Sequence, residues 1–306
     1  MTFLSLIGAL LLEQWRALDR DNPVTALFAR YAQALERQFN AGHARHGAVA
    51  WLLAVLPLAV AVALVQGLAG DAAAALGWAW SVAVLYATMG FRKFSHHFTD
   101  IEDALRRDDL PAAREALNRL RGQSCGELTR GEALRVAIEE GLLLSHRYVF
   151  GVIAWFAALG PAGAVAYRAA AILAERWGGR PGEEFGEFGQ FAARAFEIMD
   201  WLPARITALG FAVTGDFEDA VYCWRTQARS WSPAAAGVLL ATGAGALGVR
   251  LGQTIHQYGG LHYRPEMGTG EEPDVDFLRS GIGLLWRTLV LWLLLILLLS
   301  IAHWAG

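Results

Sequence analysis

Three histidine clusters are the residues of this chain whose types and spacing could bind a metal. They are His43 with His46, His96 and His97 with Asp100, and His256 with His262. Side chains three or four residues apart can share one helix face, but a metal site needs three or four ligands that converge on one point. We therefore interpret these clusters as surface groups and predict no metal site.

Familiar catalytic motifs are missing from the sequence. It contains no glycine loop ending in Lys-Ser/Thr, no Gly-x-Ser-x-Gly elbow and no cysteine pair at metal spacing. Gly243, Gly245 and Gly248 do form a Gly-x-Gly-x-x-Gly pattern, but nothing before it resembles a strand. We therefore predict that these glycines serve helix packing and do not bind a dinucleotide.

The elements that must position any site are membrane helices. Residues 48–91 carry one formal charge, Asp71, and hydrophobic residues make up 55% of the chain against 18% charged. A membrane-spanning helix needs about 20 mostly apolar residues. The stretch therefore predicts a helical hairpin, Ala48–Gln66 and Ala73–Met89, with a glycine-containing break at residues 66–71.

Three more apolar segments follow the hairpin. Residues 288–304 lack acidic and basic side chains, which predicts a second clear span. Residues 148–173 are broken by Gly-Pro-Ala-Gly at 160–163, so they form either one span that ends near Ala166 or a re-entrant helical pair. Residues 232–249 are rich in Ala and Gly, which favours close packing against another helix over a span.

Capping signals mark the polar helices. Residues 99–121 predict two short amphipathic helices, the second capped by Asp109 and stopped by Gly122. Thr129 with Glu132 forms a potential capping box at the start of the next helix.

The arginines predict the orientation. They are concentrated before and after the hairpin and absent from its turn, so the positive-inside rule places loops 13–47 and 91–146 in the cytoplasm and the 67–72 turn outside. The C-terminus is then outside. The net charge of −3 does not suggest a nucleic-acid partner.

These patterns predict an all-α, polytopic integral membrane protein with cytoplasmic helical segments. We expect one membrane domain over residues 1–306. Its parts are a transmembrane hairpin (48–90), a cytoplasmic helical segment (91–146), interfacial or re-entrant helices (147–283) and a C-terminal transmembrane helix (284–304). We expect it in the bacterial inner membrane, with the lipid bilayer and other membrane proteins as partners.

Residues 245–268, GALGVRLGQTIHQYGGLHYRPEMG, carry a family signal. The segment resembles the C-terminal part of the CobD/CbiB family, membrane proteins of cobalamin biosynthesis called adenosylcobinamide-phosphate synthases. The matching residues are Ala246–Gly252, Tyr258, Gly259, Arg264, Pro265 and Gly268. Tyr167-Arg168 and Trp201–Arg205 match in family order, so the resemblance covers nearly the whole chain.

The resemblance implies an activity and a set of binding residues. The activity is formation of an amide between a corrinoid carboxylate and aminopropanol or its phosphate, with ATP and magnesium. Seven residues are candidates for binding a corrinoid or another anionic ligand: His97, Arg168, Arg194, Arg205, Arg250, Tyr258 and Arg264. Guanidinium groups match anionic ligands well, whereas the structural alternative is pairing with Glu197, Asp200 or Glu266. No catalytic residue is identified.

Several polar positions of the family pattern are lost in this chain. Gly-Arg-Asp-Thr becomes Gly122–Cys125, Asn-Thr-Leu-Asp becomes Ala171–Ala174, and a paired Asp becomes Phe196-Glu197. Magnesium prefers carboxylate oxygens, so these losses predict that the chain replaces the family enzyme poorly or not at all.

A second function is therefore left open. The opening Met1–Leu4 and the segment Asp200–Pro203 resemble AmpE, a divergent member of the family. That resemblance implies a non-catalytic membrane regulator or sensor linked to β-lactamase induction and cell-wall signalling.

Overall fold

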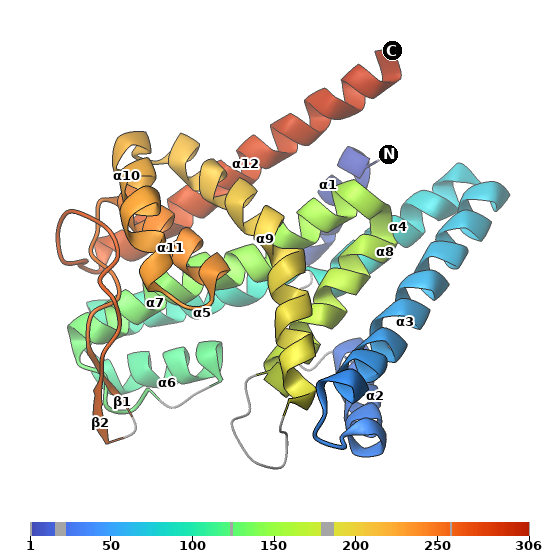
Figure 1. Cartoon of the computed structure of the whole chain (residues 1–306). Coiled ribbons are helices and arrows are strands. Elements are labelled where there is room, and N and C mark those ends of the chain that lie inside the picture. Colours follow the sequence, from blue (N-terminus) through green and yellow to red (C-terminus); the bar gives the residue numbers. More distant parts are fainter. Residues whose placement is uncertain (1, 16–22, 123–124, 179–186, 258, 306) are drawn as a thin grey trace. The chain divides into compact units, whose positions relative to one another are not determined.

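The computed structural model describes residues 2–15, 23–122, 125–178, 187–257 and 259–305, with the backbone alone at 23, 91–97 and 303–305. The helices are α1 (Thr2–Trp15), α2 (Pro23–Phe39), α3 (Ala44–Ala72), α4 (Ala74–Thr88), α5 (Phe91–Arg106), α6 (Leu110–Arg121), α7 (Arg130–Ser145), α8 (Gly151–Leu173), α9 (Phe188–Thr214), α10 (Phe217–Gln227), α11 (Ala234–Leu247) and α12 (Asp276–Ala305). Short π-helical turns η1 (His146–Phe150) and η2 (Ala174–Gly178) flank α8, and the 3-10 turn η3 (Ala228–Ser230) follows α10. Strands β1 (Ile255–Gln257) and β2 (Gly260–His262) pair antiparallel (Figure 1).

The fold is that of an all-α, polytopic membrane protein. Three segments are long and apolar enough to cross a membrane: Ala44–Ala72, Arg130–Gly178 and Asp276–Ala302. Helices α1, α4 and α11 are apolar but shorter.

The described chain forms two compact units. The first unit contains Met1–Gly90, Arg147–Pro203 and Ile296–Gly306, and the second contains Phe91–His146 and Ala204–Leu295. In the first unit, α2, α3, α8 and α9 share a core. Its buried members are Ala32, Leu35, Ala50, Ala54, Val55, Ala169, Leu173, Trp177, Phe188 and Ala192.

The predicted hairpin is present, but its turn is later than expected. Helix α3 continues through residues 66–71 to Ala72, and the chain reverses at Ala73, whose backbone is extended with φ −165°. Glycine costs a helix only about 1 kcal/mol, so the break predicted at 66–71 was wrong. The glycines instead allow close packing, because a Cβ on Gly77 would lie 3.1 Å from the Gly70 Cα.

Helix α8 is a pair of helices folded back on themselves. Gly160 has φ 64° and ψ −154°, a backbone conformation that is essentially restricted to glycine. Pro161 begins the second helix of the pair. The arms touch closely, because a Cβ on Gly163 would lie 2.3 Å from the Trp155 carbonyl oxygen. Of the two alternatives left open by the sequence, the structure contains the helical pair.

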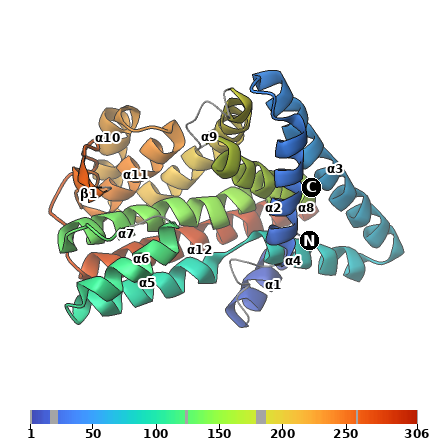
Figure 2. The same ribbon diagram turned by 90° about the horizontal axis from the view of Figure 1, so that it is seen from below.

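The second unit confirms the predicted caps. Asp109 accepts a hydrogen bond from the Ala112 amide at 3.0 Å, and Gly122 ends α6 in the left-handed region. Thr129 and Glu132 form the capping box of α7. Helices α5, α6 and α7 lie side by side (Figure 2).

Helix α11 is packed as its composition predicted. It lies against α10 and α7. A Cβ on Gly243 would meet the Leu142 side chain at 2.6 Å, and one on Gly245 would meet the Asp219 carbonyl oxygen at 2.5 Å. The Gly-x-Gly-x-x-Gly pattern therefore serves helix packing.

Helix α12 begins before the predicted start of the last span at 284–288. Asp274 accepts hydrogen bonds from the amides of Asp276 and Phe277 at 2.9 and 3.3 Å. This side chain caps the helix N-terminus, which explains why a polar turn precedes the apolar run.

Candidate functional site

A buried ion pair joins the loop after α11 to helix α7 in the second unit. Glu139, on α7, is 3% exposed. Arg264 donates to both of its carboxylate oxygens, at 2.5 Å to Oε2 and 3.2 Å to Oε1. The Gly252 amide donates to Oε1 at 2.8 Å. A two-pronged pair of this kind fixes orientation as well as charge.

Arg264 is fully engaged within the protein. Its guanidinium also donates to the carbonyl oxygens of Gln253 (3.2 Å) and Gly252 (2.9 Å), and its carbon atom Cζ lies 5.6 Å from the centre of the Trp231 ring. Arg264 therefore anchors the loop and has little capacity left for a ligand.

Local sequence explains why the loop can reach α7. Gly252 has φ 75°, and a Cβ there would lie 1.9 Å from the Pro265 carbonyl oxygen. Two backbone hydrogen bonds between Leu251 and Met267, at 2.7 and 3.0 Å, close the loop above this point. Glycine at 252 thus allows the two sides of the loop to touch.

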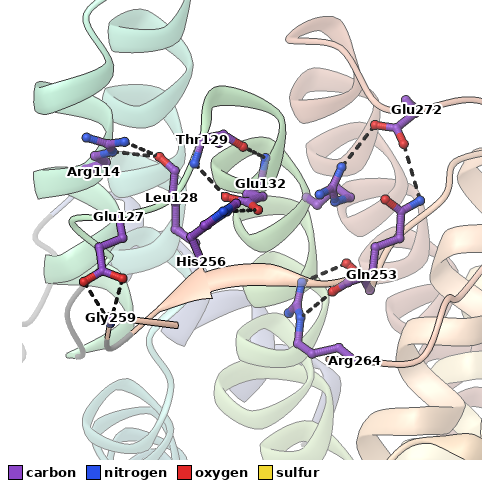
Figure 3. A network of polar contacts seen from close by, with 12 residues as sticks. Arg114, Glu127, Leu128, Thr129, Glu132, Gln253, His256, Gly259, Arg264 and Glu272 are labelled. Carbon is purple, nitrogen blue, oxygen red and sulfur yellow. Dashed lines mark hydrogen bonds and ion pairs between the residues drawn. The ribbon is translucent and has the colours of Figure 1, made fainter. Parts of the chain in front are cut away.

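A second carboxylate ties the β hairpin to the start of α7 (Figure 3). Glu132 Oε2 accepts from the Thr129 amide at 2.7 Å, and Oε1 lies 2.9 Å from His256 Nδ1. Glu127 accepts from the Gly259 amide at 2.9–3.0 Å. One capping residue therefore serves both the helix and the strand.

Glu272 makes the third link between the loop and α7. It accepts from Arg135 Nη1 at 3.0 Å and from Gln253 Nε2 at 3.4 Å. Figure 3 shows Glu132 beside His256 and Glu272 beside Gln253. The arrangement holds the loop rigidly in place.

The chemistry of these acids does not fit a preassembled magnesium cage. Glu132, Glu139 and Glu272 each already accept from a cation, a histidine or an amide. Among the described residues, no group of three or more His, Cys, Asp or Glu side chains is placed to hold a metal ion.

The predicted binding residues fall in both units. Arg250 and Arg264 lie on the loop of the second unit, with Arg205 on the second half of α9. Arg168 and Arg194 belong to the first unit. The His97 side chain and Tyr258 lie outside the described residues.

Arg250 differs from Arg264 in its surroundings. Its backbone amide donates to the Glu271 carbonyl oxygen at 2.9 Å. Its side-chain Nε is buried and has no hydrogen-bond partner among the described residues. Arg205 is half-buried, and burial lowers the pKa of its guanidinium. Of the two loop arginines, Arg264 forms an ion pair, whereas Arg250 has no ion pair with a described residue.

The other two arginines have separate settings. The Arg168 guanidinium carbon lies 4.2 Å from the centre of the Tyr148 ring, as in a cation–π contact. Arg194 is exposed on α9. Asp200, one of the expected structural partners, accepts from the Tyr167 hydroxyl at 2.7 Å.

Sequence reasoning did not pair Glu139 with Arg264, because 125 residues separate them. A signal was present nonetheless. Glu139 directly follows the apolar residues Val136, Ala137 and Ile138 on α7, and a charge that is buried with such residues requires a partner. From the sequence, His256 was considered only as a potential metal ligand with His262, and its partner Glu132 only as a helix cap.

Comparison with known proteins gives consistent matches. A sequence model described as CobD/Cbib protein matches residues 6–285. The chain is 38% identical over 300 residues to "Cobalamin biosynthesis protein CobD" of Stutzerimonas stutzeri strain A1501, which covers 96% of this chain and 97% of that protein. It is 37% identical over 211 residues to the protein of the same name from Chromobacterium violaceum. The match covers 69% of this chain and 67% of that protein.

A more distant relative carries the other family name. The chain is 29% identical over 231 residues to "Cobalamin biosynthesis protein CbiB" of Salmonella typhimurium, covering 72% of this chain and 71% of that protein. No solved structure matches this chain.

Proposed function

Because this chain belongs to the CobD/CbiB family, we propose that its role in cobalamin biosynthesis is to attach aminopropanol, or the phosphate of aminopropanol, to a corrinoid carboxylate. The relatives named for cobalamin biosynthesis support the pathway. The attachment step itself is the proposal.

The buried Glu139–Arg264 pair is the observation that carries the proposal. It fixes the loop with the strongest family resemblance against α7, through contacts at 2.5 and 3.2 Å. A rigid loop holds its binding groups in place before the ligand arrives, which lowers the entropy lost on binding. Such a loop suits a large, rigid, anionic ligand such as a corrinoid.

Arg250 is the ligand-binding group that this loop offers. Arg264 neutralises Glu139, whereas the Arg250 side chain has no ion pair with a described residue, and its buried Nε has no hydrogen-bond partner among them. A guanidinium presents several donors in a plane and matches carboxylate or phosphate oxygens. We assign Arg250 to binding an anionic group of the corrinoid or of the amine phosphate.

The reaction sets a further requirement. Forming the amide joins the amine nitrogen to the carboxylate carbon and expels one carboxylate oxygen, so a co-reactant must accept that oxygen. The family resemblance implies ATP with magnesium for this role. The described acidic residues do not form a magnesium cage. We therefore assign to the described residues of the loop the binding and positioning of the ligand.

A two-part experiment tests the proposal. Purified full-length protein is titrated with a corrinoid that bears a free carboxylate, and the same protein is assayed for the amide product with ATP, magnesium and aminopropanol phosphate. We expect binding that Arg250→Ala weakens about tenfold or more, as for loss of a charged contact. Arg229→Ala removes an exposed arginine of the same unit and is the control.

Complementation gives the cellular measurement. We expect the chain to complement a strain without the family enzyme poorly or not at all at native expression, because positions 174 and 196 hold Ala and Phe. Absence of corrinoid binding would refute the proposal. Binding without any product would contradict the attachment step.

The alternative is an AmpE-like, non-catalytic membrane regulator, and the lost acids at positions 174 and 196 favour it. One of its signature residues, Asp200, is 5% exposed and bonded to Tyr167, which suits a structural role. Deleting the gene distinguishes the two functions. Loss of cobalamin supports the first, whereas altered β-lactamase induction with normal cobalamin supports the second.

A further inference from the structure

The first unit contains a cavity of about 360 Å³ between α2, α3, α4 and α8. Its walls are mostly aliphatic and aromatic, with Phe28, Leu58, Val62, Trp80 and Ile172 among them. The volume falls within the range of about 300–1,000 Å³ that is usual for small-molecule sites. It is separate from the loop that carries Arg250.

The polar side chains of the wall, apart from one, are already satisfied. The Thr88 hydroxyl donates to the Val84 carbonyl oxygen at 2.8 Å, and the Trp80 indole N–H donates to the Val62 carbonyl oxygen at 3.3 Å. Thr25 also has a polar partner. None of these groups needs a ligand.

Arg168 is the exception. It lines the cavity and is half-buried. Its guanidinium lies over the Tyr148 ring at 4.2 Å, and no carboxylate among the described residues forms an ion pair with it. A cation beside apolar walls without an anion is costly, so the site is complementary to a ligand that brings the negative charge.

We propose that this cavity binds an anionic phospholipid, with an acyl chain against the apolar walls and the phosphate headgroup at Arg168. Charge and polarity both favour this occupant, because the cavity combines mostly apolar walls with one cation that has no ion pair among the described residues. One wall is α3, a segment that is apolar and long enough to cross a membrane. Basic pockets between membrane helices commonly hold such headgroups. This inference does not rest on the proposed function.

Native mass spectrometry of the full chain in detergent tests the proposal. The probes are phosphatidylglycerol and phosphatidylcholine with identical acyl chains, and glycerol phosphate, which has the headgroup without chains. We expect phosphatidylglycerol to bind about fivefold more tightly than phosphatidylcholine. Arg168→Gln should reduce this preference to below twofold, and Arg168→Lys should retain it.

Two further variants complete the design. Arg176→Gln removes an exposed arginine of the same unit and should leave the preference unchanged. Ala87→Phe fills the cavity and should weaken both lipids, which separates binding inside the cavity from binding at the surface. Equal affinity for the two lipids, equal effects of the 168 and 176 variants, or tight binding of glycerol phosphate alone would each overturn the proposal.

Discussion

At the residue scale, the two loop arginines shared with the family pattern have different surroundings and therefore different expected roles. Arg264 makes two contacts to Glu139 and two to backbone carbonyls. Arg250 offers a side chain without a described ion pair. Both match the family in sequence, so only the three-dimensional contacts distinguish the anchor, Arg264, from the proposed binding residue, Arg250.

Glu139→Ala should destabilise the protein by about 3–5 kcal/mol, because it leaves Arg264 and the Gly252 amide without their buried acceptor. The measurement is the free energy of unfolding in mixed micelles during SDS titration. Asp108→Asn disrupts an ion pair whose side chains are 81% and 47% exposed, and should change that free energy by about 1 kcal/mol or less. Equal losses in the two variants would show that the Glu139 pair is not an anchor.

Cys125 provides a test of the second unit's interior. Its side chain is 1% exposed, and burial raises the pKa of the thiol although the Arg121 guanidinium opposes the shift. A raised pKa leaves less thiolate at pH 8, and thiolate is the reactive form. In a Cys223→Ala background, we expect iodoacetamide to label the folded protein about tenfold or more slowly than the SDS-unfolded protein. Equal rates would mean that residue 125 is accessible.

At the element scale, the ends of a helix could be predicted where residues close together in the sequence determine them. The Asp109 cap, the Thr129 capping box and the fold-back near Gly160 are each set by residues a few positions apart, and the structure contains all three. The turn of the first hairpin was misplaced because glycines 67 and 70 resemble a break in sequence. The close contact between Gly70 and Gly77 of α4 is not revealed by a local pattern.

Gly160→Ala should destabilise the helical pair by about 1–3 kcal/mol, because φ 64° and ψ −154° form a region that is essentially restricted to glycine. The midpoint of thermal unfolding in detergent measures the loss. Gly67→Ala is the matched control, since Gly67 is helical and a Cβ there would meet nothing within 4 Å. That change should raise stability by up to about 1 kcal/mol. A neutral Gly160→Ala would argue against the fold-back.

At the scale of the whole molecule, the class and family were accessible from the sequence, whereas the site contacts were not. Apolar runs and the order of motifs can be read from the sequence directly, because each depends on residues that are close together in the chain. The pairs Glu139–Arg264 and Glu132–His256 join residues 125 and 124 positions apart, which composition and spacing cannot pair. Arg264 was predicted to be a binding residue, and its role as an anchor could be recognised only from the contacts in the structure.

Membrane topology is the prediction at this scale. If α3, α4 and α12 cross and α8 folds back, loops 13–47 and 91–146 lie in the cytoplasm and the C-terminus lies outside. Alkaline phosphatase fused after residue 306 or inserted at Ala73 should be active, whereas fusions at residue 107 should be inactive, as expected for the bacterial inner membrane. An inactive C-terminal fusion would require a different number of crossings.

The sequence separation of Glu139 and Arg264 also has a consequence for the order of synthesis. The carboxylate leaves the ribosome 125 residues before the arginine that neutralises it. At about 5–20 residues per second, the nascent chain carries Glu139 on α7 for roughly 6–25 s before Arg264 is synthesised. During that interval α7 has its own cap but no counterion, so helix formation and ion-pair closure are separate events in the life of each new chain.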